Sequence, residues 1–169
     1  DHASGITDSD TVTVGGNLIA TTDDNDGVIN MGTLAVTGTI TLTTDGSGAA
    51  TIDNGTANID IAAASVGGNL TLTSGAAAGI TDSGTVTVDG DLAATTDAGN
   101  GVINMDQLEV DGSIALTTNG NGAATVVNDE GIEFAASTVR GALTATATTG
   151  NITQGAAVAV TGTSSFTTS

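Results

Sequence analysis

The sequence predicts an all-β fold, a parallel β-helix in which short strands coil around one narrow core. Three observations predict it: internal repeats with a fixed period, apolar residues at every second position, and a composition rich in Thr, Gly, Val and Ala. β-Branched and small residues suit pleated sheet and tight turns, and the chain has no Pro, Trp or Tyr. The 169 residues are expected to form a single repeat segment.

The longest repeat spans 74 residues. Residues 5–14 return as residues 79–88 with one difference, and residues 46–52 return in similar form as residues 120–126. The first of these types begins a third time near Ile152. We therefore divide residues 1–169 into super-repeats at about 5–78 and 79–151 and a partial third at 152–169. Such self-similarity is typical of solenoids, because each unit buries its apolar side against the next.

A shorter unit recurs inside the super-repeat and begins at a Val. Its seven anchors are Val14, Val36, Val66, Val88, Val110, Val139 and Val160. A Gly stands two positions after each anchor, at Gly16, Gly38, Gly68, Gly90, Gly112, Gly141 and Gly162. A Thr stands seven positions after each anchor, at Thr21, Thr43, Thr73, Thr95, Thr117, Thr146 and Thr167. The anchors are 22, 30, 22, 22, 29 and 21 residues apart, which predicts about seven rungs of about 22 residues, three in each super-repeat.

Each unit should contain a short strand, because its apolar residues recur at every second position. Residues 70–72 and 86–88 show the alternation most clearly. Clusters of Gly and Asn such as residues 119–122 should form turns, since a positive φ costs little there. The added residues at 52–66 and 126–139 are expected to form loops or a bulged corner outside the coil. An antiparallel β-sandwich is the alternative, although it does not require identical residues at equal offsets.

The Gly column is expected to form turns and the Thr column a structural ladder, because equivalent positions of such a coil stack at roughly 4.8 Å. Flat Thr arrays can also bind ice, which leaves an ice-binding solenoid as an alternative. The column two residues before the ladder holds Thr only at Thr41, Thr71 and Thr144, so this array is incomplete.

The unit resembles the repeats of filamentous haemagglutinin-like large exoproteins, as residues 36–44 and 66–73 show in the form Val-x-Gly-x-Leu/Ile-x-Leu-Thr. The resemblance covers the whole chain and implies a long, right-handed β-helical fibre. It also implies a secreted or cell-surface bacterial adhesin with a host-surface or matrix ligand. Because the chain starts and stops inside a rung pattern, we expect a slice of a longer protein or a subunit that stacks end to end.

The charge of the chain limits the partners it can bind. The net charge is −18, with 19 acidic residues, one Arg and no Lys. Nucleic acid binding is not expected, because it needs Lys and Arg to replace counterions, and no apolar run is long enough for membrane insertion. An enzyme is not expected either, since His2 and Arg140 are isolated. A carbohydrate-active solenoid enzyme is the least favoured alternative.

Acidic residues are the candidate metal ligands. Two groups occupy neighbouring positions of consecutive rungs: Asp89, Asp91 and Asp111, and Asp23, Asp24, Asp26 and Asp45. Like charges this close repel by about 1 kcal/mol, and Ca²⁺ would remove that cost. The favoured interpretation is that the charges provide solubility and protect strand edges. No cofactor is expected to be required, and Ca²⁺ is the one cation considered.

A polar residue also stands six positions before each anchor, at Asp8, Asn30, Asp60, Asp82, Asn104, Glu133 and Gln154. Such residues are expected to form hydrogen bonds to the turn backbone. Glycosylation sequons begin at Asn54, Asn69 and Asn151, a number that chance alone explains.

Overall fold

The chain forms a right-handed parallel β-helix of about eight turns spaced about 21 residues apart, which confirms the predicted fold class. The computed structural model describes residues 4–23 and 25–169. Asp24 and His2, which figured in the sequence analysis, lie outside the described residues. Within those residues every regular element is a strand, and no helix is long and apolar enough to span a membrane.

Two large sheets make up the coil. The first sheet has ten strands: β1 (Ile6–Thr7), β4 (Ile29–Met31), β7 (Ala50–Asp53), β9 (Leu70–Ser74), β12 (Leu92–Thr96), β14 (Ser113–Thr117), β16 (Ile132–Phe134), β17 (Ser137–Val139), β19 (Ile152–Gln154) and β20 (Val158–Val160). The second has nine: β3 (Leu18–Thr21), β6 (Ile40–Thr43), β8 (Ile59–Val66), β10 (Ile80–Asp82), β11 (Val86–Val88), β13 (Ile103–Val110), β15 (Ala124–Asn128), β18 (Leu143–Ala147) and β21 (Ser164–Thr168). A short pair, β2 (Val12–Val14) and β5 (Leu34–Val36), completes the first turns.

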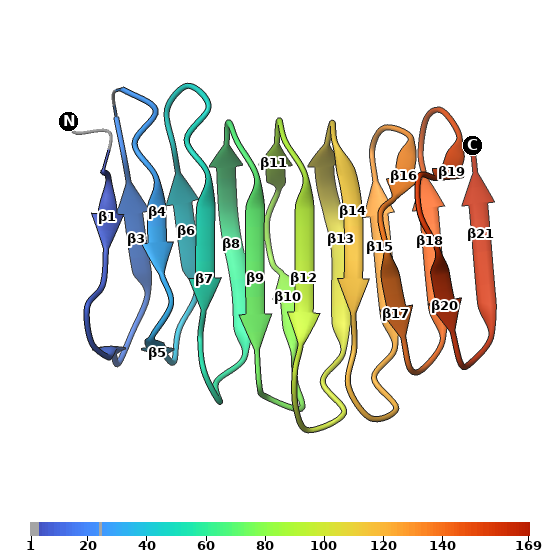
Figure 1. Ribbon diagram of the computed structural model, residues 1–169, viewed down its shortest axis with the longest axis horizontal. Coiled ribbons are helices and arrows are strands. Elements are labelled where there is room, and N and C mark those ends of the chain that lie inside the picture. Colours follow the sequence, from blue (N-terminus) through green and yellow to red (C-terminus); the bar gives the residue numbers. More distant parts are fainter. Residues whose placement is uncertain (1–3, 24) are drawn as a thin grey trace.

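The chain runs along the first sheet and returns along the second, so strands of the two sheets point in opposite directions in Figure 1, while neighbours within each sheet are parallel. β1 and β21 lie at opposite ends of the long axis (Figure 1). Every second side chain points into the space between the sheets, as the alternation predicts.

The core consists of stacked columns of identical or similar side chains. Leu70, Leu92 and Ile114 are Cα partners in β9, β12 and β14, and each is fully buried. Burying one such side chain stabilises the fold by about 2 kcal/mol, and the column repeats this contact in every turn. Phe134 is the one aromatic residue in the buried core, at 2 % exposure.

The 74-residue repeat places its copies on opposite sheets. β1 lies in the first sheet, whereas its copy β10 lies in the second; β3 and its copy β12 are exchanged in the opposite sense. The reason is geometric, because 74 residues correspond to about three and a half turns of about 21 residues. The chain therefore has about eight turns where the unit count predicts about seven.

The expected loops at residues 52–66 and 126–139 are wrong. The first interval contains the eight-residue strand β8, and the second contains β16 and β17. Each long interval spans about a turn and a half of the coil and carries the chain from one sheet to the other. Alternation of apolar residues continues through both intervals, since Ile59, Ile61 and Ile132 are all buried.

Candidate functional surfaces

Two buried Asn side chains stand where the repeat changes sheets. β7 ends at Asp53, so Val36 of β5 has no strand partner on that side. The Asn54 side chain replaces the strand: its Oδ1 accepts the N–H of Val36 at 2.8 Å, and its Nδ2 donates to the Val36 carbonyl at 3.0 Å. Nδ2 also donates to the Asn58 carbonyl at 2.6 Å. Asn54 is 1 % exposed, so its sequon is inaccessible in the folded coil.

Asn128 repeats this arrangement in the second copy. It accepts the N–H of Val110 at 2.8 Å and donates to the Val110 and Gly131 carbonyls at 3.0 and 2.8 Å. The side chain is fully buried. Sequence analysis did not single out Asn128, although the matching offset between it and Asn54 was a usable signal.

Buried Thr residues form a second set that sequence analysis missed. Each follows a ladder Thr directly and donates through its hydroxyl to a Gly carbonyl in the next turn of backbone: Thr22 to Gly27, Thr44 to Gly48, Thr96 to Gly101 and Thr118 to Gly122, at 2.6 to 2.8 Å. The Thr-Thr doublets at these places were the available signal. These hydroxyls hold the corners of the coil, because an unpaired buried hydroxyl would cost stability.

The predicted Thr ladder is divided into three stacks. Thr21 and Thr43 pair in the second sheet, and Thr146 pairs with Thr167 in the same sheet near the other end. Thr73, Thr95 and Thr117 pair in the first sheet. The structure therefore does not bring the seven residues onto one face, because the repeat changes sheets between the stacks.

The predicted Gly column is divided in the same way. Within a stack each Gly donates its N–H to the Gly one turn earlier, as Gly112 does to Gly90 at 3.1 Å and Gly162 to Gly141 at 2.9 Å. A Cβ on Gly162 would lie 2.6 Å from the Gly141 carbonyl oxygen, and one on Gly112 would overlap that of Gly90. Close approach of successive turns is therefore what requires Gly at these positions.

Gly16 is the exception in this set. Among the described residues, a Cβ placed on Gly16 would meet no atom within 4 Å. Its φ is outside the left-handed region, so its backbone conformation does not require Gly either.

Several acidic side chains connect consecutive turns. Asp26 accepts the N–H and hydroxyl of Ser47 at 2.7 and 3.1 Å, and Asp91 accepts those of Ser113 at 2.7 and 2.8 Å. These backbone and hydroxyl hydrogen bonds hold the pKa of both carboxyl groups below the ordinary value. Asn100 makes the equivalent contact with Asn121, at 2.9 Å, which shows that the contact does not depend on charge.

The remaining calcium candidates lie on exposed turns. Asp89 and Asp111 follow the paired residues Val88 and Val110, so they occupy consecutive turns of one column. Asp23 and Asp45 are exposed in the first copy. Among residues 4–23 and 25–169, no group of three or more His, Cys, Asp or Glu side chains is arranged to hold a metal ion.

The polar column six positions before each anchor has mixed environments. The Asp8 carboxylate accepts the backbone N–H groups of Gly32 and Thr33 at 3.1 and 2.8 Å, as predicted for a turn contact. Asp82 does the same in the second copy and is half-buried. Asn30, Asn104 and Glu133 instead lie in strands and are exposed, so the expectation of a turn contact is wrong for these three.

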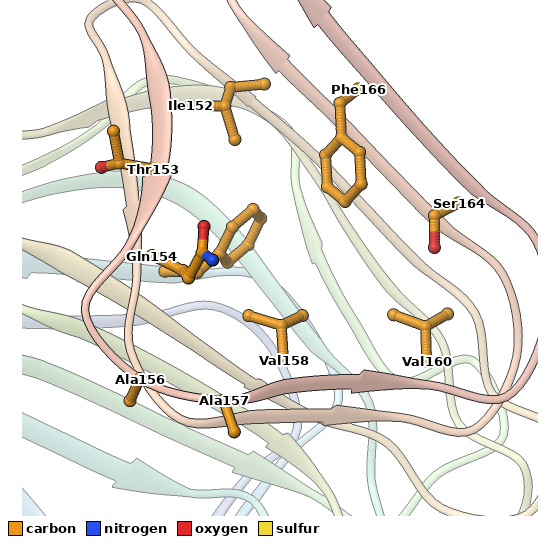
Figure 2. Close-up of a pocket in the computed structure, with 10 residues that line it drawn as sticks. Ile152, Thr153, Gln154, Ala156, Ala157, Val158, Val160, Ser164 and Phe166 are labelled. Atoms are coloured by element: carbon orange, nitrogen blue, oxygen red, sulfur yellow. The ribbon is translucent and has the colours of Figure 1, made fainter.

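The last turn contains the largest hollow of the described surface. It has a volume of about 600 Å³, and Figure 2 shows Phe166, Val158 and Val160 facing its interior. Phe166 is 53 % exposed and meets Phe134 edge to face, with ring centroids 6.3 Å apart. β19 and β21 end their sheets, so among the described residues their outer edges have no strand partner.

Comparison with known proteins finds a family resemblance for part of the chain. Residues 121–169 match a family model described as repeats of unknown function (DUF5649). No curated protein and no solved structure matches the chain. The matched segment runs from the turn before β15 to the last turn, so the repeats of that family are similar to the part of the coil that contains the open hollow.

Proposed function

We propose that the chain is a rigid structural segment of a secreted or cell-surface fibrous protein, with adhesion as the purpose of the fibre. The observation that supports this proposal is the unbroken parallel ladder from β1 to β21, in which every turn repeats the same core and the same turn contacts. Backbone hydrogen bonds that run along the axis in every turn resist bending and stretching.

The composition of the outer surface is consistent with an extracellular structural role. Acidic side chains lie on the exposed turns and connect successive turns, as Asp26 and Asp91 do, while most outward strand positions hold Thr, Ala or Ser. A net charge of −18 opposes unspecific aggregation. The similarity to filamentous haemagglutinin-like repeats supports the adhesive part of the proposal.

The Thr rows do not favour ice binding. A flat array would need the Thr side chains on one face, and the longest run, Thr73, Thr95 and Thr117, has Ala93 and Ala115 two positions earlier in its last two strands. Thermal hysteresis no greater than that of an inert control protein is the expected result, and a larger value would support the ice-binding alternative.

Calcium binding stays a prediction from the sequence. A specific site should raise the melting temperature in millimolar Ca²⁺ above the value in chelator, and should do so more than a monovalent salt at equal ionic strength. Equal melting temperatures would leave the acidic residues with the structural role that Asp26 and Asp91 already have.

The rigidity of the segment can be measured with two spin labels. The chain has no Cys, so Thr7→Cys and Thr153→Cys introduce the only thiols, on exposed positions of β1 and β19. Seven steps between turns of roughly 4.8 Å place the labelled backbones on the order of 35 Å apart. A narrow distance distribution near that value supports the proposal, and a broad one would contradict it.

A further inference from the structure

The open hollow in the last turn is lined by core residues, not by surface residues. Ile152, Val158 and Val160 continue the inward columns of the coil, yet they are only partly buried. In the middle of the coil the equivalent residues Ile80, Val86 and Val88 are fully buried, because another turn covers them. The last turn therefore presents an apolar surface whose shape is that of a core waiting for one more turn.

The first turn of the chain has the form of that missing turn. Ile6, Val12, Val14 and Gly16 are spaced as Ile152, Val158, Val160 and Gly162 are, and the flanking strands fall in corresponding places, with β1 and β19 in the first sheet and β3 and β21 in the second. The apolar residues of the first turn are also only partly buried. Two half-open surfaces of the same period thus lie at opposite ends of one molecule.

The two aromatic and small residues of these turns are complementary. Phe166 pairs with Ala145 in β18, and in the first turn the position equivalent to Phe166 is Ala20. A first turn stacked on the last would therefore place Ala20 next to the exposed ring, so that the large side chain lies between two small ones.

Gly16 is an independent observation that points to the same contact. Within the described residues nothing approaches it, whereas Gly38, Gly112 and Gly162 each face a carbonyl oxygen of the preceding turn. A turn beneath Gly16 that ended in Gly162 would bring a carbonyl oxygen to that place, as Gly141 does for Gly162. The absence of a side chain at Gly16 then has a purpose that the isolated coil does not provide.

Charge favours contact at this end of the molecule. Residues 141–169 contain no charged side chain, although the chain as a whole carries −18. The first turn carries Asp8 and Asp10, which would be repelled by an acidic surface and are not repelled by a neutral one.

We propose that the last turn of one molecule binds the first turn of a second copy, head to tail and in parallel register, through the Ile152, Val158, Val160 and Phe166 surface. The second copy extends both sheets and the core without a change of period. This proposal rests on the structural role proposed above and names the partner for it.

The test is association measured by sedimentation and by electron microscopy over a range of concentration. The unaltered chain and Gly15→Ala should form rods whose length grows with concentration. Gly15 is a matched control, since it has no neighbour within 4 Å and its column carries side chains such as Asp89 and Asp111 in other turns. Gly16→Ala should associate about 10- to 100-fold more weakly, because its Cβ would overlap the docked turn. Its melting temperature as a monomer should equal that of Gly15→Ala.

A complementation experiment identifies the two surfaces. Phe166→Asp places a charge in the hollow and leaves the first turn intact, whereas Gly16→Ala blocks the first turn and leaves the hollow intact. Each variant should be a 16.1 kDa monomer alone, and an equal mixture should form a one-to-one dimer that grows no further. A dimer supports the proposal, and a mixture that stays monomeric overturns it.

Two further outcomes overturn the proposal: an unaltered chain that stays monomeric at every concentration, or a Gly16→Ala variant that forms rods as the unaltered chain does. Neither outcome affects the structural role, because the distance between labels at Thr7→Cys and Thr153→Cys can be measured in the Gly16→Ala background. A narrow distribution there with no association would separate failure of the docking from failure of the proposed function.

Discussion

The two full copies of the 74-residue repeat make the same contacts on opposite sheets of one coil. Asn54 bonds Val36 in the first copy as Asn128 bonds Val110 in the second, and the distances agree. The buried hydroxyls of Thr22 and Thr96 donate to equivalent Gly carbonyls. The repeat therefore specifies contacts between a turn and its neighbours. Which sheet carries them follows from the number of residues between copies.

The copies differ most clearly at a pair of equivalent carboxyl groups. Asp8 and Asp82 each accept two backbone N–H groups from the following turn. The hydrogen bonds, led by that from Thr33, hold the pKa of Asp8 below its ordinary value. Burial raises the pKa of Asp82, and the charge of Asp106 adds to the effect. Because Gly32 occupies the place of Asp106 in the first copy, position within the coil and one neighbour reverse the direction of the shift.

The largest predicted effect breaks the contact that the copies share. Asn54→Ala and Asn128→Ala should each lower the free energy of unfolding by roughly 3 kcal/mol, because the N–H and carbonyl of a buried Val lose their partners. Urea unfolding followed by circular dichroism measures the loss. Asn119→Ala is the control, since Asn119 is exposed, and it should change stability by less than about 0.5 kcal/mol. Effects that differ strongly between the two buried positions would refute the equivalence of the copies.

The second prediction concerns the Gly stacks. Gly38→Ala and Gly112→Ala occupy equivalent positions, and a Cβ at either would meet the carbonyl of the preceding turn. Each should cost about 1–3 kcal/mol in the same unfolding measurement, as overpacking generally does. Gly16→Ala should be neutral for the monomer, and a loss as large as that of Gly38→Ala would show that Gly16 already has a close neighbour.

The smallest predicted effect separates the two carboxyl groups by pH. The lowered pKa of Asp8 contributes stability that is present above about pH 3.8 and is lost as the pH falls through its folded pKa. The raised pKa of Asp82 has the opposite sign, since ionisation above that pKa costs stability and protonation at lower pH restores it.

Unfolding of Asp8→Asn and Asp82→Asn at a series of pH values tests this assignment. At pH 7 we expect Asp8→Asn to be less stable than the unaltered chain and Asp82→Asn to be at least as stable. Both differences should shrink as the pH falls below the pKa of the residue replaced. A loss at pH 7 that is equal in the two variants would contradict the reversal of the shift.

Sequence alone predicted the strands, the parallel coil and the narrow core, because the alternation at residues such as 70–72 and 86–88 depends only on which side chains face inward. It did not predict the change of sheet. Both sheets use the same alternation of apolar and polar residues, so a shift of half a turn leaves the pattern unchanged. The long intervals were therefore interpreted as loops.

The candidate sites were predictable to a smaller extent. The repeated Gly positions were found, but the reason for them, a carbonyl from the preceding turn, depends on the distance between turns. The acidic residues were identified as calcium ligands or solubility charges, whereas Asp26 and Asp91 have hydrogen bonds to the next turn that the sequence does not reveal. Buried Asn128 was missed because an amide can replace a strand only where two strands differ in length.

Disulfide formation between introduced Cys residues tests the exchange of sheets most directly. Thr43 and Ser65 are Cα partners in the second sheet, and backbones one turn apart are close enough for a disulfide. Thr73 follows Thr43 in the sequence units but lies in the first sheet. In a chain without native Cys, Thr43→Cys/Ser65→Cys should oxidise to a bridged monomer and Thr43→Cys/Thr73→Cys should not. Bridging of the second pair in place of the first would contradict the account.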